Sequence, residues 1–395
     1  MKKYDINKPY ELKKGVYKLN DEPNFNYQLN RIINWDGGRL EDILPISNGI
    51  KNSSDWKREL IKIGDIALKD DRIDNAIAYY RMSEFFMYDG DPDKLKYYEL
   101  ATKLFYEYYE DYFNGDNPII KLDYIPYLNV KLPVMHLKPE GIPKGKILIH
   151  GGNDSYFEEF LFTVLYLKDL GYEVYMFEGP GQGGVVRVQN MHFTYKWEEP
   201  VKAVLDYYNL DDITIIGISL GGYLAPRAAA FDSRITKVVA WSVFPCFLDV
   251  IMGQLNNKTK KMFKFAMKFH LKPIINKAFK KRAKKSPIID WGLKHGCYAY
   301  EAKDAYGYAN KLKEYDIKPV ADKITQDMLI IGASKDHFID CHLINKELDM
   351  LTNTKSLTFR LFKELEEAEN HCNVGNGKIV LDFIDSWIEG INNEI

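Results

Sequence analysis

The residues best suited to chemistry lie at 217–221, where the sequence reads Gly-Ile-Ser-Leu-Gly. A β-branched run at 213–217 leads directly into this pentapeptide, and a helix-compatible stretch follows it. A serine in this strand–turn–helix setting is typical of a nucleophile elbow, in which a tight turn requires small neighbours and exposes the hydroxyl. We therefore expect Ser219 to be a nucleophile. The backbone N–H of Leu220 would then stabilise the oxyanion that the attack creates.

A second oxyanion donor is expected after the strand at 146–150, which ends in His150-Gly151-Gly152-Asn153. A His-Gly-Gly segment after a strand supplies a backbone N–H to the oxyanion in sites built around such an elbow. Gly152 and Asn153 both remain candidates for this donor. We interpret His150 itself as a structural residue.

Asp336 and His371 are the expected partners of Ser219. Asp336 follows an apolar strand at 328–332, and His371 comes after the last expected strand, at 356–362. The order serine, acid, histidine is the one that accompanies a nucleophile elbow. His371 would take the serine proton, while Asp336 would hold the imidazole in one tautomer and stabilise its cation.

Other polar residues cluster near Asp336. We expect Asp340 to cap the following helix. His337 is adjacent to the acid and His342 falls on a helix, so neither replaces His371 as the base. The spacing of His337, Asp340, Cys341 and His342 fits no closed zinc pattern. We therefore expect no metal and no cofactor.

Two patterns divide the chain. Residues 53–115 read as three amphipathic helices, with Asp55 as the cap of the first. From about residue 118, short β-branched runs alternate with helical stretches, which favours a mostly parallel sheet covered on both faces. The expected strands are 119–124, 130–137, 146–150, 173–177, 213–217, 237–243, 328–332 and 356–362. We expect a helical lid domain at 1–115 and a catalytic domain at 116–395.

A helical insertion at 250–315 interrupts the alternation, and its segment 258–285 is rich in lysine. One interpretation is a helix that lies on a membrane surface. We favour a lid-like insertion whose apolar face rests on the main domain and whose lysines are solvated.

Bulk composition excludes several classes of protein. The 395 residues exceed what one core holds, about 250–300 residues, and the net charge of −2 gives no case for nucleic acid. No apolar run of about 18 residues exists, and residues 1–5 lack a signal-peptide pattern. The four cysteines form no Cys-x-x-Cys pair. We expect a cytoplasmic protein with reduced thiols and no membrane partner.

Further segments carry a resemblance beyond these site residues. They are Glu178-Gly179-Pro180-Gly181-Gln182-Gly183, His-Gly-Gly-x-Asp-Ser at 150–155, Gly-x-Ser-Leu-Gly-Gly at 217–222, Asp-His-Phe at 336–338, Glu-Asn-His-Cys at 369–372, and, in the helical part, Trp56, Gly64, Ala67 and Tyr-Tyr-Arg-Met-Ser at 79–83. From about residue 50 onward the chain resembles the α/β-hydrolase group that contains 2,6-dihydroxypseudooxynicotine hydrolase and the fungal yellowish-green hydrolases that shorten polyketides. That group is also similar to the fermentation/respiration switch proteins.

The resemblance implies an α/β-hydrolase fold with a helical N-terminal domain that closes over the catalytic edge. It implies, for some members, cleavage of a carbon–carbon bond next to a ketone. Carried over by position, the triad is Ser219, Asp336 and His371. An acidic residue near the substrate is also implied about thirty positions after the nucleophile. Asp249 falls there, although it is shorter than the glutamate of the group, and the alternative is that it caps the first helix of the insertion.

We therefore expect a serine hydrolase that forms an acyl-enzyme with a small ester or activated ketone, and the substrate can contain an aromatic ring. Substrate-contacting side chains are expected from 55–115 and 244–310. Peptide cleavage or acyl transfer on the same fold remains an alternative, as does a non-catalytic binding protein. The N-terminal helices could instead bind a partner protein, and a homodimer is compatible with the sequence.

Overall fold

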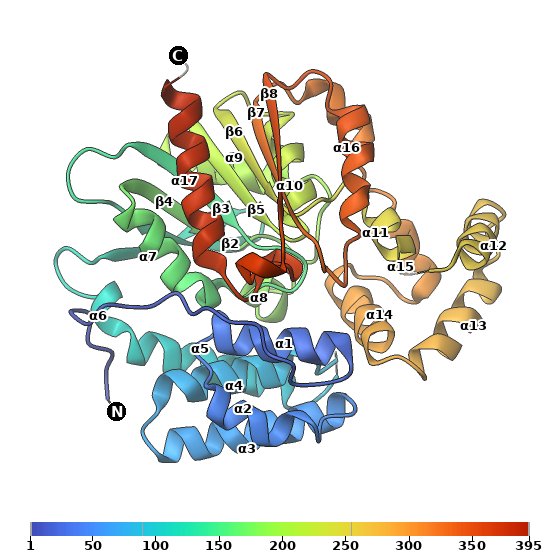
Figure 1. Ribbon diagram of the computed structural model, residues 1–395, viewed down its shortest axis with the longest axis horizontal. Helices are drawn as coiled ribbons and strands as arrows, with labels where there is room; N and C mark the ends of the chain where they lie inside the picture. Colours follow the sequence, from blue (N-terminus) through green and yellow to red (C-terminus); the bar gives the residue numbers. More distant parts are fainter. Residues whose placement is uncertain (1, 89, 254, 394–395) are drawn as a thin grey trace.

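The structure is a computed structural model that describes residues 2–88, 90–253 and 255–393. Its centre is an eight-stranded sheet in the order β1-β2-β4-β3-β5-β6-β7-β8 (Figure 1). The pairs β1–β2 and β2–β4 are antiparallel, and the remaining pairs are parallel. The strands are β1 (Ile120–Tyr127), β2 (Val130–Leu137), β3 (Gly145–His150), β4 (Tyr172–Phe177), β5 (Ile213–Ile218), β6 (Ile235–Trp241), β7 (Asp327–Ala333) and β8 (Ser356–Phe362). All eight strands expected from the sequence are confirmed.

Alternate residues of the central strands enter two separate cores. Ile216 and Ile218 of β5 pack with helices α7 and α17, whereas Ile213 and Ile215 pack with α9 and α10 on the opposite face. Burial on both faces explains why these strands read as continuous apolar runs in the sequence. The covering helices are α7 (Leu161–Asp169), α9 (Glu198–Tyr208), α10 (Gly221–Ala229), α16 (Ile344–Met350) and α17 (Gly377–Asn393). No helix in the described ranges has the length and apolar character needed to cross a membrane.

Short elements connect the sheet to its surroundings. They are α8 (Gly183–Arg187), η1 (Phe157–Phe160), η2 (Lys318–Lys323), η3 (Cys341–Leu343), η4 (Glu364–Glu366) and η5 (His371–Asn373), where η marks a 3₁₀ turn.

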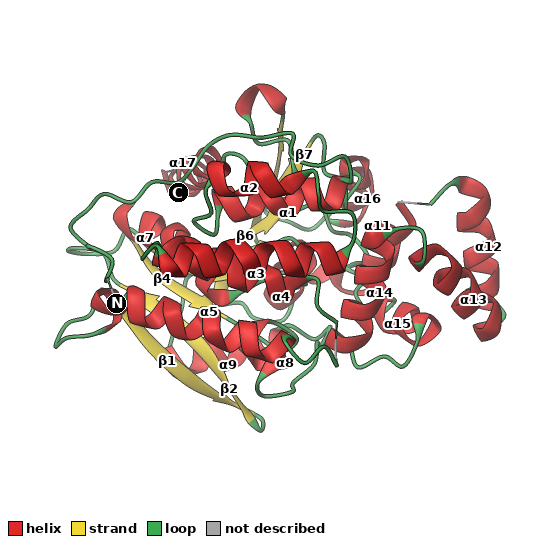
Figure 2. Cartoon of the chain, turned by 90° about the horizontal axis from the view of Figure 1, so that it is seen from below, coloured by secondary structure: helices red, strands yellow, loops and turns green. Residues whose placement is uncertain are grey.

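The chain before the sheet forms a helical layer that faces the viewer in Figure 2. Its helices are α1 (Pro23–Asn34), α2 (Leu40–Ser47), α3 (Ser53–Lys69), α4 (Ile73–Phe85), α5 (Lys94–Tyr108) and α6 (Glu110–Phe113). The three helices expected in 53–115 are α3, α4 and α5, while α1 and α2 were not anticipated. The expected cap of α3 is wrong, because the side chain of Asn52 accepts the N–H groups of Ser54 and Asp55 and Asp55 itself lies in the first turn.

A buried ionic network ties this layer to the sheet. Glu84 of α4 is fully buried, and Arg187 of α8 donates to its two carboxylate oxygens at 2.8 and 3.1 Å. The ammonium of Lys94 and the hydroxyl of Tyr156 also donate to this carboxylate. Burial alone would raise the pKa of Glu84, but the cations Arg187 and Lys94 outweigh it and hold the pKa at about 2. The N-terminal helices are thus joined to the segments that follow β3 and β4.

The insertion between β6 and β7 contains α11 (Phe247–Gly253), α12 (Asn257–Lys268), α13 (Lys272–Ala283), α14 (Pro287–Ala299) and α15 (Ala305–Leu312). Its helical character is confirmed. The expected packing is wrong in one respect. The buried side of α12, with Phe263 and Met267, forms a small core with Met252, Ile275 and Ala309 of the insertion itself, separate from the two cores of the sheet.

Replacing Glu84 by glutamine tests the ionic network. The variant removes the carboxylate that neutralises the buried guanidinium of Arg187, so the free energy of unfolding should fall by about 3–5 kcal/mol. Glu107→Gln is the matched control, since Glu107 on α5 pairs with Lys103 in solvent, and its effect should stay below about 1 kcal/mol. Urea denaturation measures both. Equal losses in the two variants would contradict the account.

Candidate active site

Ser219 lies in a strained turn between β5 and α10. Its φ angle is +61°, which non-glycine residues adopt rarely and mostly where the surrounding structure enforces it. A Cβ on Gly217 would lie 2.2 Å from the carbonyl oxygen of Gly221, so the turn closes only with glycine at 217. The spacing Gly-x-Ser-x-Gly therefore follows from backbone contact across the turn, which holds the serine hydroxyl at the beginning of α10.

The three residues expected to act together meet although they are far apart in sequence. The Oγ atom of Ser219 lies 2.8 Å from Nε2 of His371, which begins η5 after β8. The other ring nitrogen of His371, Nδ1, lies 2.6 Å from Oδ2 of Asp336, in the loop after β7. Both the histidine and the aspartate are buried or nearly so. The geometry is that of a serine, an imidazole and a carboxylate in one hydrogen-bonded chain.

The carboxylate of Asp336 is oriented by its own loop. Its Oδ1 atom accepts the backbone N–H groups of Phe338 and Ile339 at 2.8 and 2.9 Å, which leaves Oδ2 for His371. Burial alone would lower the pKa of His371. The negative charge of Asp336, the neighbouring Cys372 and the hydrogen bond to Asp336 outweigh this effect and raise the pKa of His371 well above the usual histidine range.

The candidate oxyanion donors lie on two loops in close contact. A Cβ on Gly152 would lie 2.7 Å from Cβ of Ser219 and 2.8 Å from the backbone nitrogen of Leu220, so only glycine permits this approach. The N–H of Gly152 donates to Oγ of Ser155 at 2.6 Å. Within the described part of the chain, the N–H groups of Leu220 and Asn153 donate to no acceptor. Of the two alternatives for the second donor, Asn153 therefore has the available N–H.

Asn153 is held in place by the insertion. Its carbonyl oxygen accepts a hydrogen bond from Nε2 of His295 on α14 at 3.1 Å, and its side-chain oxygen accepts from the Tyr300 hydroxyl at 2.8 Å. Burial lowers the pKa of His295 to about 4, so this imidazole is neutral and carries its proton on Nε2, facing the carbonyl.

Helix α1 supplies two residues of the site that sequence analysis missed. Arg31 donates to both carboxylate oxygens of Glu159, at 2.7 and 2.9 Å, and lies 3.3 Å from the carboxylate of Asp154. The ring of Tyr27 lies 5.9 Å from the ring of His371, measured between centroids. One helix thus contacts both the loop after β3 and the histidine of the site.

A cavity of about 600 Å³ opens onto Ser219. Its walls come from α1, from the loops at the end of the sheet and from the insertion, and they are mainly apolar. Characteristic lining residues are Tyr27, Trp35, Asn153, Ser219, Phe247, Phe263, Phe279, Tyr308, Phe338 and His371. The expectation that 244–310 contributes is confirmed. The expectation for 55–115 is wrong, because the N-terminal contribution comes instead from residues 27–35 on and just after α1.

Asp249 does not line this cavity. It lies in the first turn of α11, and its carboxylate accepts a hydrogen bond from Nζ of Lys346 at 2.6 Å. The structure therefore directs Asp249 toward α16. Both earlier interpretations, a substrate-binding acid and a helix cap, lack support from its contacts.

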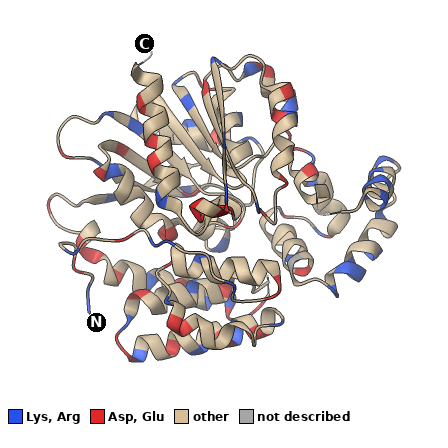
Figure 3. Ribbon diagram, viewed as in Figure 1, with Lys and Arg blue, Asp and Glu red and all other residues tan. Residues whose placement is uncertain are grey.

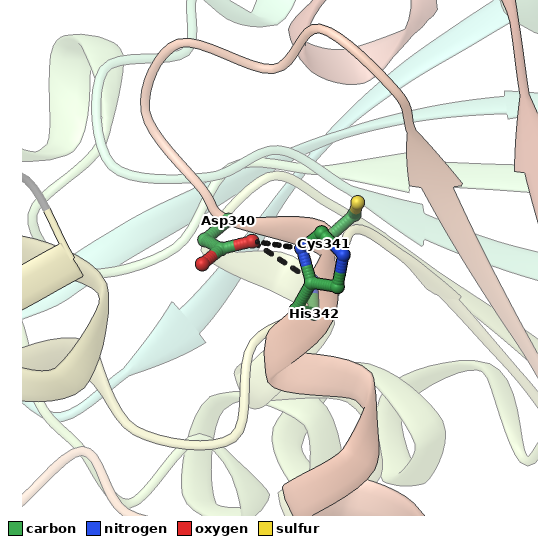
Figure 4. A group of neighbouring side chains, drawn as sticks. All are labelled: Asp340, Cys341 and His342. Atoms are coloured by element: carbon green, nitrogen blue, oxygen red, sulfur yellow. Dashed lines mark hydrogen bonds and ion pairs between the residues drawn. The ribbon is translucent and has the colours of Figure 1, made fainter.

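Asp340, Cys341 and His342 are the one group of three potential metal ligands close together among the described residues. Figure 4 shows two hydrogen bonds between Asp340 and His342. The Asp340 carboxylate accepts the backbone N–H of His342 at 3.0 Å and lies 2.8 Å from Nδ1 of the His342 ring. The first of these bonds makes Asp340 the cap of η3, as expected. Burial raises the pKa of the Cys341 thiol, which disfavours the thiolate form that binds metals. The group is accounted for as a capped turn.

Two further histidines have depressed pKa values. Burial lowers the pKa of His150 and of His337 to about 4 in each case. His150 is fully buried at the end of β3, and its Nδ1 lies 3.0 Å from the carbonyl oxygen of Gly151. Neither imidazole contacts the Ser219 hydroxyl in the way that His371 does.

Comparison with known proteins now adds to this geometry. Residues 147–344, half of the chain, match the alpha/beta hydrolase family. The chain therefore belongs to the alpha/beta hydrolase family.

Three of the curated relatives come from fungi. The alpha/beta hydrolase psoB of Aspergillus fumigatus is 31% identical over 283 residues, which is 61% of this chain and 62% of the relative. The hydrolyase poxO of Penicillium oxalicum is 30% identical over 268 residues, 59% and 63% of the two chains. The 20-hydroxy-prefusarin hydrolase FUS2 of Gibberella moniliformis is 34% identical over 186 residues, which is 42% of this chain and 43% of the relative. The match spans less than two thirds of the length of each of these relatives.

Solved structures share the fold. The crystal structure of 2,6-dihydroxy-pseudo-oxynicotine hydrolase superposes with a TM-score of 0.60 at 17% identity, covering 91% of this chain and 94% of the other. AbyA5 superposes with a TM-score of 0.59 at 13% identity, covering 81% and 80%. The first match extends over nine tenths of the chain.

Gly152→Ala tests the close contact of the two loops. The added methyl group meets backbone atoms that cannot rotate away, so the free energy of unfolding should fall by about 1–3 kcal/mol. Gly390→Ala on α17 is the control, because a Cβ there meets no atom within 4 Å and alanine is the better helix former. The control should be as stable as the parent or more so. A Gly152→Ala protein with unchanged thermal unfolding would contradict the packing described.

Proposed function

We propose that this protein is a serine hydrolase in which Ser219 forms a covalent acyl-enzyme with a small ester or activated ketone. The observation that carries the proposal is the 2.8 Å separation between Oγ of Ser219 and Nε2 of His371, two residues that both line the cavity. The hydrogen bond from His371 to Asp336 on the other side of the ring supports the same assignment.

In the proposed mechanism His371 accepts the Ser219 proton as the hydroxyl attacks a carbonyl carbon. Asp336 keeps the imidazole in the tautomer that leaves Nε2 free and stabilises the imidazolium that forms. The N–H groups of Leu220 and Asn153 receive the developing oxyanion, and each preorganised donor of this kind lowers the barrier by about 3–4 kcal/mol. Neither N–H has another acceptor among the described residues, which supports this role.

The leaving group decides which bond the enzyme can break. Protonated His371 transfers its proton to an alkoxide when the substrate is an ester. A carbon leaving group departs only if a neighbouring carbonyl delocalises its charge, so a β-diketone meets the requirement and a simple ketone does not. In both cases water then attacks the acyl-enzyme, with His371 as base. Similarity to the 20-hydroxy-prefusarin hydrolase is consistent with hydrolysis, but the name of that relative does not say which bond is cleaved.

We propose further that residues 1–115 and the insertion at 250–315 enclose the substrate. The apolar lining from α1 and from α12 to α15 supports a compact substrate with apolar or aromatic character. Arg31 is neutralised by Glu159 and Asp154, so in this proposal it fixes the loop after β3.

Ser219→Ala tests the proposal directly. Hydrolysis of a p-nitrophenyl ester and cleavage of an aryl β-diketone should both lose several orders of magnitude in kcat, since the nucleophile is absent. Ser386→Ala on α17 is the matched control, because Ser386 is exposed and bonds only within its helix. Unchanged turnover in Ser219→Ala would refute the assignment. In the parent enzyme, the ratio of the two rates identifies the preferred bond.

The pH dependence follows from the raised pKa of His371. Only the neutral imidazole can accept the serine proton, so kcat/KM should rise with pH through one ionisation and then level off. Because Asp336 raises this pKa, the midpoint should lie above the reference value for histidine, about 6.5. Asp336→Asn removes the negative charge and should move the midpoint to lower pH as well as lowering kcat. A pH profile whose midpoint is the same in both proteins would contradict the electrostatic role.

A further inference from the structure

Helices α12 and α13 carry the most uneven charge distribution of the chain. The segment 250–289 contains no Asp or Glu, and Figure 3 shows only Lys and Arg coloured on these two helices. Its cations are Lys258, Lys260, Lys261, Lys264, Lys268, Lys272, Lys277, Lys280, Lys281, Arg282, Lys284 and Lys285. Among the described residues, Lys272 alone of this group forms an ion pair, with Asp304 at 2.9 Å. The other cations of the segment have no acidic side chain within ion-pair distance among the described residues.

The same two helices expose large apolar side chains. Met262, Phe265 and Phe269 are each more than half exposed, and their spacing of three and four residues aligns them along the outside of α12 and its end. The rings of Phe265 and Phe269 lie 4.6 Å apart. On the neighbouring helix α13, Ile274 is also exposed, at 55%. The opposite side of α12, with Phe263 and Met267, is buried in the insertion, so this helix has two apolar sides and only one is covered.

Lysines border the exposed row closely. Lys258 lies one turn before Met262 on the same side of α12, and Lys261 and Lys268 flank the row. On α13, Lys277 and Lys281 follow Ile274 at intervals of three and four residues, and all three are exposed. Figures 1 and 2 both place these helices at one extremity of the molecule, away from the sheet.

We propose that the outer side of α12 and α13 binds an anionic lipid surface, with the apolar row inserted among the acyl chains near the headgroups and the lysines on the lipid phosphates. A basic helix with exposed aromatic and aliphatic side chains is the form that lies in a membrane interface, and lysines bordering an inserted row meet the negative lipid charge. The sequence-based expectation of no membrane partner rested on the lack of a spanning segment, which adsorption to a surface does not require.

Charge argues against the other occupants of this surface. A second copy of the chain would bring an equally positive patch against the first, and like charges in contact are unfavourable. Nucleic acid would satisfy the lysines but would leave Met262 and Ile274 without the apolar environment that a bilayer supplies. Phe263 and Phe279 of the same two helices line the catalytic cavity. A bound lipid surface would thus lie beside the route that an apolar substrate takes to that cavity.

Co-sedimentation of the whole protein with vesicles tests the proposal without any turnover, so its outcome is independent of the role of Ser219. The protein should bind vesicles of phosphatidylcholine with one third phosphatidylglycerol at least tenfold more tightly than vesicles of phosphatidylcholine alone. The triple variant Lys261→Glu, Lys264→Glu, Lys268→Glu should lose this preference. Phe265→Ser with Phe269→Ser should weaken binding to anionic vesicles at least tenfold.

Matched controls lie elsewhere on the surface. Lys311→Glu, Lys313→Glu and Lys318→Glu change the net charge equally at three exposed lysines, and Leu128→Ser with Leu365→Ser removes two exposed apolar side chains. Both controls should bind like the parent, and circular dichroism should show that every variant is folded. Absence of binding to anionic vesicles, equal loss in patch and control variants, or preferential binding of single-stranded DNA would each overturn the proposal. So would a dimer that the Phe265/Phe269 variant dissociates.

Discussion

The positive φ angle at Ser219 is the constraint from which the rest of the site follows. A turn this tight brings the backbone of 217 against that of 221, and it places the serine hydroxyl at the beginning of α10. The loop after β3 then approaches so closely that Gly152 contacts Ser219 and Leu220 without room for a methyl group. The proposed oxyanion donors, the N–H groups of Leu220 and Asn153, belong to these two closely packed segments. The proposed chemistry therefore depends on small residues that make close backbone contact possible.

Strain of this kind persists only where the surroundings hold it in place. The sheet provides one support, because β3 and β5 are paired neighbours that deliver the two loops to the same edge. Arg31 provides a second from α1, through Glu159 and Asp154, and His295 and Tyr300 provide a third from the insertion, through Asn153. The loop after β3 is thus fixed from three directions, and two of these supports come from parts of the chain more than a hundred residues away.

Sequence reasoning succeeded where a local pattern carries the physical requirement. The eight strands were predictable because burial on both faces demands continuous apolar runs. The meeting of Ser219, Asp336 and His371 could be expected because each follows a strand in the order that the elbow requires, while their catalytic role stays a prediction. Tyr27 and Arg31 were missed because their partners in the site lie 123 and more residues away. A signal for their helix existed nonetheless, since Pro23 begins α1 and Phe25, Leu29 and Ile32 recur at helical spacing.

The central claim is that Ser219 is the nucleophile and that His371 activates it. A fluorophosphonate probe, followed by mass spectrometry of the labelled peptides, tests this claim most directly because the probe reports the activated serine whatever the natural substrate. The account predicts one adduct per chain, on Ser219, formed rapidly in the parent and far more slowly in His371→Ala. A folded parent protein that stays unlabelled, or an adduct on any other residue, would contradict it.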